Sequence, residues 1–195
     1  MAAPRAWKEL AKGVFALALE PFRVNVGLAV GEEQALLVDT GCSLEMGGEI
    51  LELARSITEL PLGAVNSHGH FDYCFGNGIL EADLIWSRRL CAEDLGGDGL
   101  EHPRAGVSRL RSRQPHGCPR LPLEEQAQLD LGDRIVTLIH PGRGHIDNDV
   151  VAWIATERIV FAGDLVEEGG RPPSRSPFPW SGWTRSVPSW SLTRT

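Results

Sequence analysis

Three apolar segments of this 195-residue chain each lead into residues that commonly bind metal ions, with a glycine alongside. Short apolar runs bounded by turn residues are typical of buried strands. In α/β proteins, strand ends at the rim of a sheet are the usual place for a functional site. The pattern therefore predicts a sheet whose strand ends gather imidazole and carboxylate groups. The three sets of candidate residues are His68-Gly69-His70-Phe71-Asp72, Gly144-His145 and Gly163-Asp164.

The first of these sets places two imidazoles and a carboxylate at alternate positions, His68, His70 and Asp72. Alternate side chains of an extended backbone point the same way, so we expect these three to converge on one point. Neutral imidazole nitrogens and carboxylate oxygens are ligands for zinc and neighbouring transition metals. A His-x-His pair also occurs on polar surface loops, and the agreement with His145 and Asp164 is what favours a metal site.

The hydrophobic pattern predicts an α/β fold. Residues 48–60 carry apolar side chains at helical spacing and are followed by Pro61, which predicts an amphipathic helix. Ser87 is a candidate N-cap for a second, short helix over residues 87–95. Strands are predicted over residues 14–19, 24–30, 35–38, 64–67, 83–86, 128–133, 134–140, 150–154 and 158–162.

Two segments lack this periodicity. Residues 96–120 are rich in glycine, proline and arginine and are predicted to form a surface loop over the site, in which His116 and Cys118 are weak candidates for further metal ligands. Residues 171–195 are rich in proline, serine and arginine and hold no acidic residue, which predicts an irregular tail. We therefore expect one domain over residues 1–170, followed by this tail.

Charge and composition argue against several classes of partner and of protein. The net charge of −7 argues against nucleic acid or an anionic membrane as a partner. No apolar run approaches the ~20 residues needed to span a bilayer, and the four cysteines lack the spacing of a disulfide scaffold. We expect a cytoplasmic protein that acts on a small-molecule substrate, and its oligomeric state is left open.

Taken together, these residues resemble the metallo-β-lactamase fold superfamily, with a pattern like that of its glyoxalase II subgroup. The resemblance covers roughly residues 14–168 and implies a four-layer αβ/βα sandwich. Asp39 ends a predicted strand, where it either caps the strand or orients neighbouring backbone or a metal ligand. The resemblance rests on Asp39-Thr40-Gly41, His68-x-His70-x-Asp72, Gly144-His145 and Phe161-Ala162-Gly163-Asp164.

The resemblance implies a role for each candidate residue. His68, His70 and His145 would bind a first metal ion, Asp72 a second, and Asp164 would bridge the two. Asp72 is also the candidate catalytic residue, because it is placed to orient the nucleophile. The implied cofactor is one or two Zn²⁺ ions, with iron or manganese as alternatives. Zinc lowers the pKa of a bound water to about 7, which implies hydrolysis of a small ester, thioester or lactone.

Two departures from the family pattern leave alternatives open. Tyr73 stands where the family often has a histidine, and no histidine follows Asp164, so the second half of the sandwich is expected to be truncated or replaced by the tail. One alternative is therefore a relative that binds a single metal ion and has little or no activity, and another is an iron-dependent oxidoreductase of the same fold. Tyr73 either donates a hydrogen bond to a developing oxyanion or simply packs.

Overall fold

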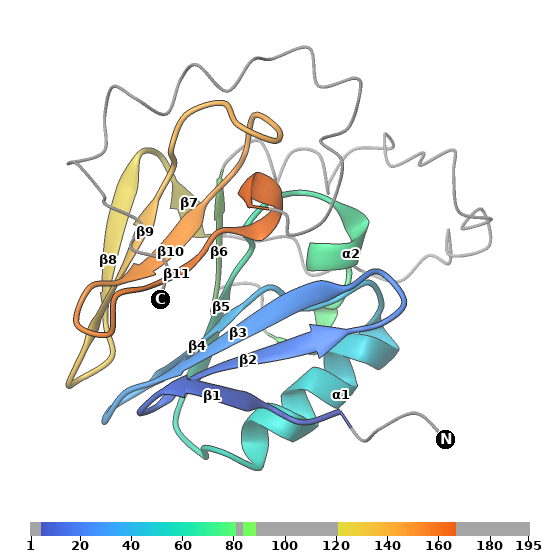
Figure 1. The fold of residues 1–195 in the computed structure, drawn as a ribbon, viewed down its shortest axis with the longest axis vertical. Helices are drawn as coiled ribbons and strands as arrows, with labels where there is room; N and C mark the ends of the chain where they lie inside the picture. Colours follow the sequence, from blue (N-terminus) through green and yellow to red (C-terminus); the bar gives the residue numbers. More distant parts are fainter. Residues whose placement is uncertain (1–4, 81–83, 89–120, 167–195) are drawn as a thin grey trace.

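Two β-sheets packed face to face form the body of the protein (Figure 1). The computed structural model describes residues 5–80, 84–88 and 121–166. Helix α1 (Leu44–Arg55) covers the face of the larger sheet that points away from the smaller one. The described residues thus contain a helix layer and two sheet layers, and the predicted α/β sandwich is confirmed.

The larger sheet has seven strands, which follow one another in space in the same order as in the chain. The first four pair antiparallel, and the pairs from the fourth strand onward are parallel. Its strands are β1 (Lys8–Ala11), β2 (Val14–Leu19), β3 (Val24–Val30), β4 (Ala35–Val38), β5 (Leu62–Val65), β6 (Ile85–Arg88) and β7 (Leu121–Leu123).

The parallel pairing of β4 with β5 brings two candidate segments together. Val38 lies opposite Val65, so both strands end at the same rim of the sheet. Asp39 directly follows the first of these strands, and Ser67 and His68 follow the second. The chain segments that carry them therefore leave the sheet side by side.

The smaller sheet brings the other two candidate segments to one end. Its strands are β8 (Gln126–Asp130), β9 (Ile135–Ile139), β10 (Val151–Ile154) and β11 (Ile159–Phe161), all antiparallel. Ile139 at the end of β9 lies opposite Val151, and Phe161 at the end of β11 lies opposite Ala152. The loop that holds His145 and the segment that holds Asp164 therefore start from the same end of the sheet.

Strand β4 is buried on both faces of the larger sheet. Neighbouring side chains of a strand point to opposite faces. Leu36 packs between the two sheets and Leu37 packs with the α1 side of the core, and each is at most 2% exposed. Burying a leucine contributes roughly 1.5–3 kcal/mol, so a strand covered on both faces consists of a continuous apolar run.

Helix α1 begins four residues earlier and ends five residues earlier than the sequence pattern predicted. Ser43 caps it, since its side-chain oxygen accepts a hydrogen bond from the backbone N–H of Met46 at 3.1 Å. Beyond the helix, the Arg55 guanidinium donates to the backbone carbonyls of Thr58 and Leu60. These contacts hold the following residues in a turn, although their apolar spacing continued the helical pattern.

The prediction of a second helix that begins at Ser87 is wrong. Ser87 lies inside β6, because that strand pairs in parallel with both β5 and β7, and its Trp86 lies opposite Val65 and Leu121. Residues 89–95 lie outside the described residues. So do the predicted loop over 96–120 with His116 and Cys118, and the predicted tail over 171–195.

The remaining predicted strands agree with the structure to within a few residues, and β1 and β7 were not predicted. Strand β1 has mostly exposed side chains, so it has no apolar pattern to reveal it. Among the described residues, no helix has the length and apolar character required to cross a bilayer.

Candidate metal centre

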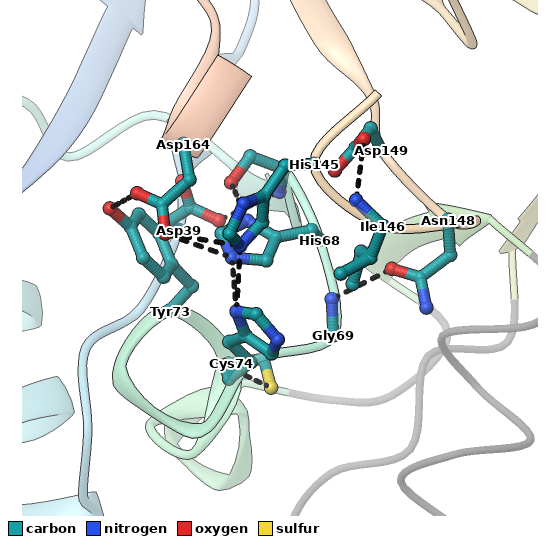
Figure 2. A network of polar contacts seen from close by, with 12 residues as sticks. Asp39, His68, Gly69, Tyr73, Cys74, His145, Ile146, Asn148, Asp149 and Asp164 are labelled. Atoms are coloured by element: carbon teal, nitrogen blue, oxygen red, sulfur yellow. Dashed lines mark hydrogen bonds and ion pairs between the residues drawn. The ribbon is translucent and has the colours of Figure 1, made fainter. Parts of the chain in front are cut away.

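Four side chains from three separate segments converge at one rim of the sandwich, and Figure 2 shows three of them, His68, His145 and Asp164. His68 lies in the loop after β5, and His70 immediately precedes the short helix α2 (Phe71–Cys74). His145 lies in the loop between β9 and β10, and Asp164 lies in the 3-10 turn η4 (Gly163–Leu165) after β11. One potential ligand atom from each of the four lies within 4.8 Å of the others.

The distances between these atoms fit a single small cation. His70 Nδ1 is 3.1 Å from His68 Nε2 and 3.1 Å from His145 Nε2. Asp164 Oδ2 is 3.4 Å from His145 Nε2 and 3.6 Å from His68 Nε2. A tetrahedral ion with bonds of ~2.0–2.1 Å separates its ligand atoms by ~3.3 Å. These four separations are thus close to the edge length of one coordination tetrahedron, and all the ligand atoms lie within 4.8 Å of one another.

The hydrogen-bonding capacity of His70 gives a second reason to expect a cation. A neutral imidazole nitrogen has either one proton or one lone pair in the ring plane. His70 Nδ1 therefore cannot form good hydrogen bonds with both His68 Nε2 and His145 Nε2, although both lie 3.1 Å away. A cation at the centre would accept the lone pairs of all three nitrogens, so the donor set fits a metal ion.

His68 is held in the form that binds metals. Burial lowers its pKa well below the usual value of 6.5, and the neighbouring His70 and His145 lower it further. The neutral ring is therefore favoured. Its Nδ1 lies 3.1 Å from the hydroxyl of Ser67. With the proton on Nδ1, donated to Ser67, the lone pair of Nε2 faces the other ligands.

The carboxylate of Asp39 holds the backbone of the loop that carries His68 and His70. Its side chain is buried, and its Oδ1 accepts a hydrogen bond from the backbone N–H of Ser67 at 2.7 Å. Its φ of 69° is one that Asp tolerates better than most residues. Burial raises the pKa of Asp39 to about 8, against the lowering effect of the Ser67 hydrogen bonds, and the charges of Asp164 and Asp72 raise it further. Of the predicted roles for Asp39, orientation of the backbone is the one observed.

This contact allows a paired test. We expect Asp39→Ala to destabilise the metal-free protein by about 2–3 kcal/mol, because a buried N–H loses its acceptor and alanine is strained at this φ. Asp39→Asn should cost less than ~1 kcal/mol, since it keeps an acceptor oxygen and tolerates the same φ. Urea unfolding would measure both. Equal destabilisation in the two variants would contradict the assigned role.

The loop that holds His145 is tied to the His68 loop by residues that the sequence did not single out. Asn148 Oδ1 accepts from the backbone N–H of Gly69 at 2.8 Å, and Asp149 Oδ2 accepts from the N–H of Ile146 at 3.0 Å. Asparagine and aspartate are common in loops, so their presence there carried no signal.

A second buried network connects the segment after α2 to the ends of β4 and β5. The side chains of Asn66 and Asn77 hydrogen-bond to each other through both amide groups, at 2.8 and 3.0 Å. The hydroxyl of Thr40 lies 2.8 Å from Asn77 Oδ1. These contacts fasten the segment after α2 to the two strands beneath the ligands.

The predicted site residues separate into two groups. His68, His70, His145 and Asp164 form the cluster, whereas Asp72 is not among its four members. The predicted alternation holds only as far as His70, whose backbone is extended, because the chain turns into α2 at the next residue. Asp72 lies close enough to raise the pKa values of neighbouring groups, Asp39 among them. Its roles as second ligand and catalytic residue stay predictions.

Tyr73 does not point to open solvent. The residue as a whole is 7% exposed, and its ring lies 4.3 Å from the His68 ring, measured between centroids. Its hydroxyl donates to Asp164 Oδ1 at 2.5 Å. Burial raises the pKa of the phenol, and the hydrogen bond and charge of Asp164 raise it further, so Tyr73 is a neutral donor.

The fold and the cluster together define an α/β sandwich with a candidate metal centre at one rim, and comparison with known proteins assigns the family. A sequence model of the metallo-beta-lactamase superfamily matches residues 19–189, and the chain belongs to this superfamily. The acyl-coenzyme A thioesterases MBLAC2 of Homo sapiens and Bos taurus are each 28% identical to it over 190 residues. The alignments cover 84% of this chain and 67% of each relative.

Solved structures confirm the fold. The DIM-1 metallo-beta-lactamase superposes with a TM-score of 0.67 at 18% identity, covering 87% of this chain and 73% of that one. TMB-1 gives a TM-score of 0.65 at 20% identity, with coverages of 87% and 74%. A metallo-beta-lactamase from Pontibacter korlensis gives 0.65 at 18%, with 86% and 75%. The resemblance read from the sequence is therefore confirmed at the level of the family.

Proposed function

We propose that this chain is a metal-dependent hydrolase that cleaves the thioester or ester bond of a small acyl substrate. The observation that carries this proposal is the convergence of three imidazole nitrogens and one carboxylate oxygen, from three segments, at the spacing of one coordination sphere. The similarity to relatives named acyl-coenzyme A thioesterase supports a thioester as the substrate class.

The donor set suits zinc, since three nitrogens and one oxygen match its usual protein ligands, and it also accepts iron or manganese. A zinc ion bound there would lower the pKa of a coordinated water to about 7 and polarise the carbonyl of the substrate. The protein's own contribution is to hold the ligands in place. Ser67 and Asp39 do so for His68, and Asn148 does so for the neighbouring loop.

The exposure of the ligands defines the side from which a substrate approaches. The side chain of His68 is 1% exposed, whereas those of His145 and Asp164 are 19% and 23% exposed. The substrate carbonyl would therefore reach the centre past His145 and Asp164. Asp72, in α2 beside His70, is the residue proposed to orient the attacking water.

An apolar pair beside the centre suits the acyl part of such a substrate. Phe22, in the turn between β2 and β3, packs edge-on against Phe71 with ring centroids 5.3 Å apart. Phe71 directly follows His70, and Phe22 is 42% exposed. Covering this exposed ring with an acyl chain would bury apolar surface at ~25 cal/mol per Å².

The function is tested by measuring metal content and hydrolysis on the same purified chain. We expect bound zinc in a whole-number ratio, and hydrolysis of an acyl-coenzyme A thioester that a chelator abolishes and added Zn²⁺ restores. An aryl ester and a lactone, assayed in parallel, would rank the substrate classes. Hydrolysis that the chelator does not affect would contradict the proposed metal dependence.

Two other outcomes identify the alternatives. Stoichiometric metal with no turnover of any of the three substrates would indicate a metal-binding relative with little or no activity. Bound iron together with oxygen consumption would indicate an oxidoreductase of the same fold.

A further inference from the structure

Tyr73, the only tyrosine in the chain, contacts two members of the cluster at once. Its ring lies against the imidazole of His68, and its hydroxyl donates to Asp164 Oδ1 at 2.5 Å (Figure 2). Tyr73 as a whole is 7% exposed, so water competes little for this hydrogen bond. A phenol that donates to a carboxylate makes a charge-assisted hydrogen bond, which is among the stronger kinds.

This bond assigns different partners to the two oxygens of Asp164. Oδ2 faces His145 and His68, at 3.4 and 3.6 Å, and is the oxygen available to the ion that the histidines bind. Oδ1 accepts the hydrogen bond from the Tyr73 hydroxyl. A carboxylate that bridges two ions through both of its oxygens presents one oxygen to each. Here the second oxygen holds a proton donor instead, and a second ion could replace that donor only by displacing a buried phenol.

We propose that Tyr73 is a positioning residue that aims Asp164 Oδ2 at the three histidines of a centre that binds a single ion. The inference rests on the proposed function only in that the centre binds a metal. Tyr73 acts through Asp164 and need not touch the substrate. Partners that orient metal ligands in this way typically change metal affinity 10–100-fold when they are removed.

The test is a zinc titration of the full chain, made metal-free and checked to be folded, in competition with a chromophoric chelator. Elemental analysis counts the ions. We expect one zinc per wild-type chain. Tyr73→Phe keeps the ring against His68 and removes only the hydroxyl. It should also bind one zinc, with affinity lower by about 10–100-fold.

A double-mutant cycle separates positioning from a general packing role. If Tyr73 acts through Asp164, then Tyr73→Phe should change zinc affinity less than twofold when Asp164 is already alanine. A purely structural role would lower affinity equally in both backgrounds. That equal effect would overturn the assignment, as would wild-type affinity in the single variant or two zinc ions per wild-type chain.

A measurement on the unmutated protein gives an independent check. Because Tyr73 is the only tyrosine, labelling with 3-fluorotyrosine yields one ¹⁹F resonance in the folded protein. We expect this resonance to shift on zinc addition and to stop shifting at one equivalent. A change that continues to two equivalents would contradict the single-ion site. A wild-type chain that binds no zinc at all would instead remove the proposed function itself.

Discussion

Replacing His145 by alanine is expected to abolish stoichiometric metal binding and to lower thioester hydrolysis by about 10³-fold. His145 Nε2 is one of three nitrogens in the cluster, 3.1 Å from His70 Nδ1 and 3.4 Å from Asp164 Oδ2. Loss of metal-assisted charge stabilisation is worth several kcal/mol, and each ~1.4 kcal/mol is tenfold in rate. The ring is partly exposed, so its removal leaves no closed cavity and the fold should persist.

His140 supplies the matched control for this variant. It precedes the same loop, and its Nδ1 hydrogen-bonds to the backbone carbonyl of Asp149 at 2.7 Å, but it does not belong to the cluster. His140→Ala should therefore keep the metal ion. Elemental analysis and initial rates on both variants decide the matter. A His145→Ala protein that retains its full complement of zinc would refute the proposed ligand set.

Gly76→Ala is expected to cause a large loss of stability. A Cβ atom on Gly76 would lie 2.0 Å from the backbone carbonyl oxygen of Thr40, far inside any real contact. Thr40 cannot give way easily, because it is fully buried and its hydroxyl lies 2.8 Å from Asn77 Oδ1. The end of β4 and the segment after α2 would have to move apart. We expect a loss of about 3 kcal/mol.

The control is a second glycine-to-alanine change, at Gly48 inside α1. Among the described residues, no atom outside the neighbouring helix backbone lies within 4 Å of a Cβ built there, so alanine should stabilise the helix by roughly 0.5–1 kcal/mol. Urea unfolding of both metal-free variants measures the difference. A Gly76→Ala protein as stable as the wild type would contradict the close packing of these segments.

Much of the architecture was predictable because it is encoded locally. The apolar runs that became β2, β3 and β4 lie between turn residues, and their bounds agree with the structure residue for residue. The errors fall where a distant contact overrides a local pattern. Ser87 was predicted to cap a helix, yet it lies in a strand because β6 pairs with β5 and β7 on either side.

The candidate ligands also include both correct predictions from local pattern and one error. His68, His70, His145 and Asp164 were predicted because their residue types and positions after apolar runs are visible without a structure. The convergence of Asp72 with them was predicted from an alternation that assumes extended backbone. That assumption fails one residue after His70, where α2 begins.

The chain's residue types and their order establish that this is a metallo-beta-lactamase superfamily member with an imidazole and carboxylate cluster. How the cluster is supported was decided only by tertiary structure. Asp39 supports the Ser67 backbone, and Tyr73 reaches Asp164 across 91 residues of chain. The reason is physical: strand periodicity acts between near neighbours, whereas a hydrogen bond between distant residues depends on how separate sheets pack and on the register of their strands.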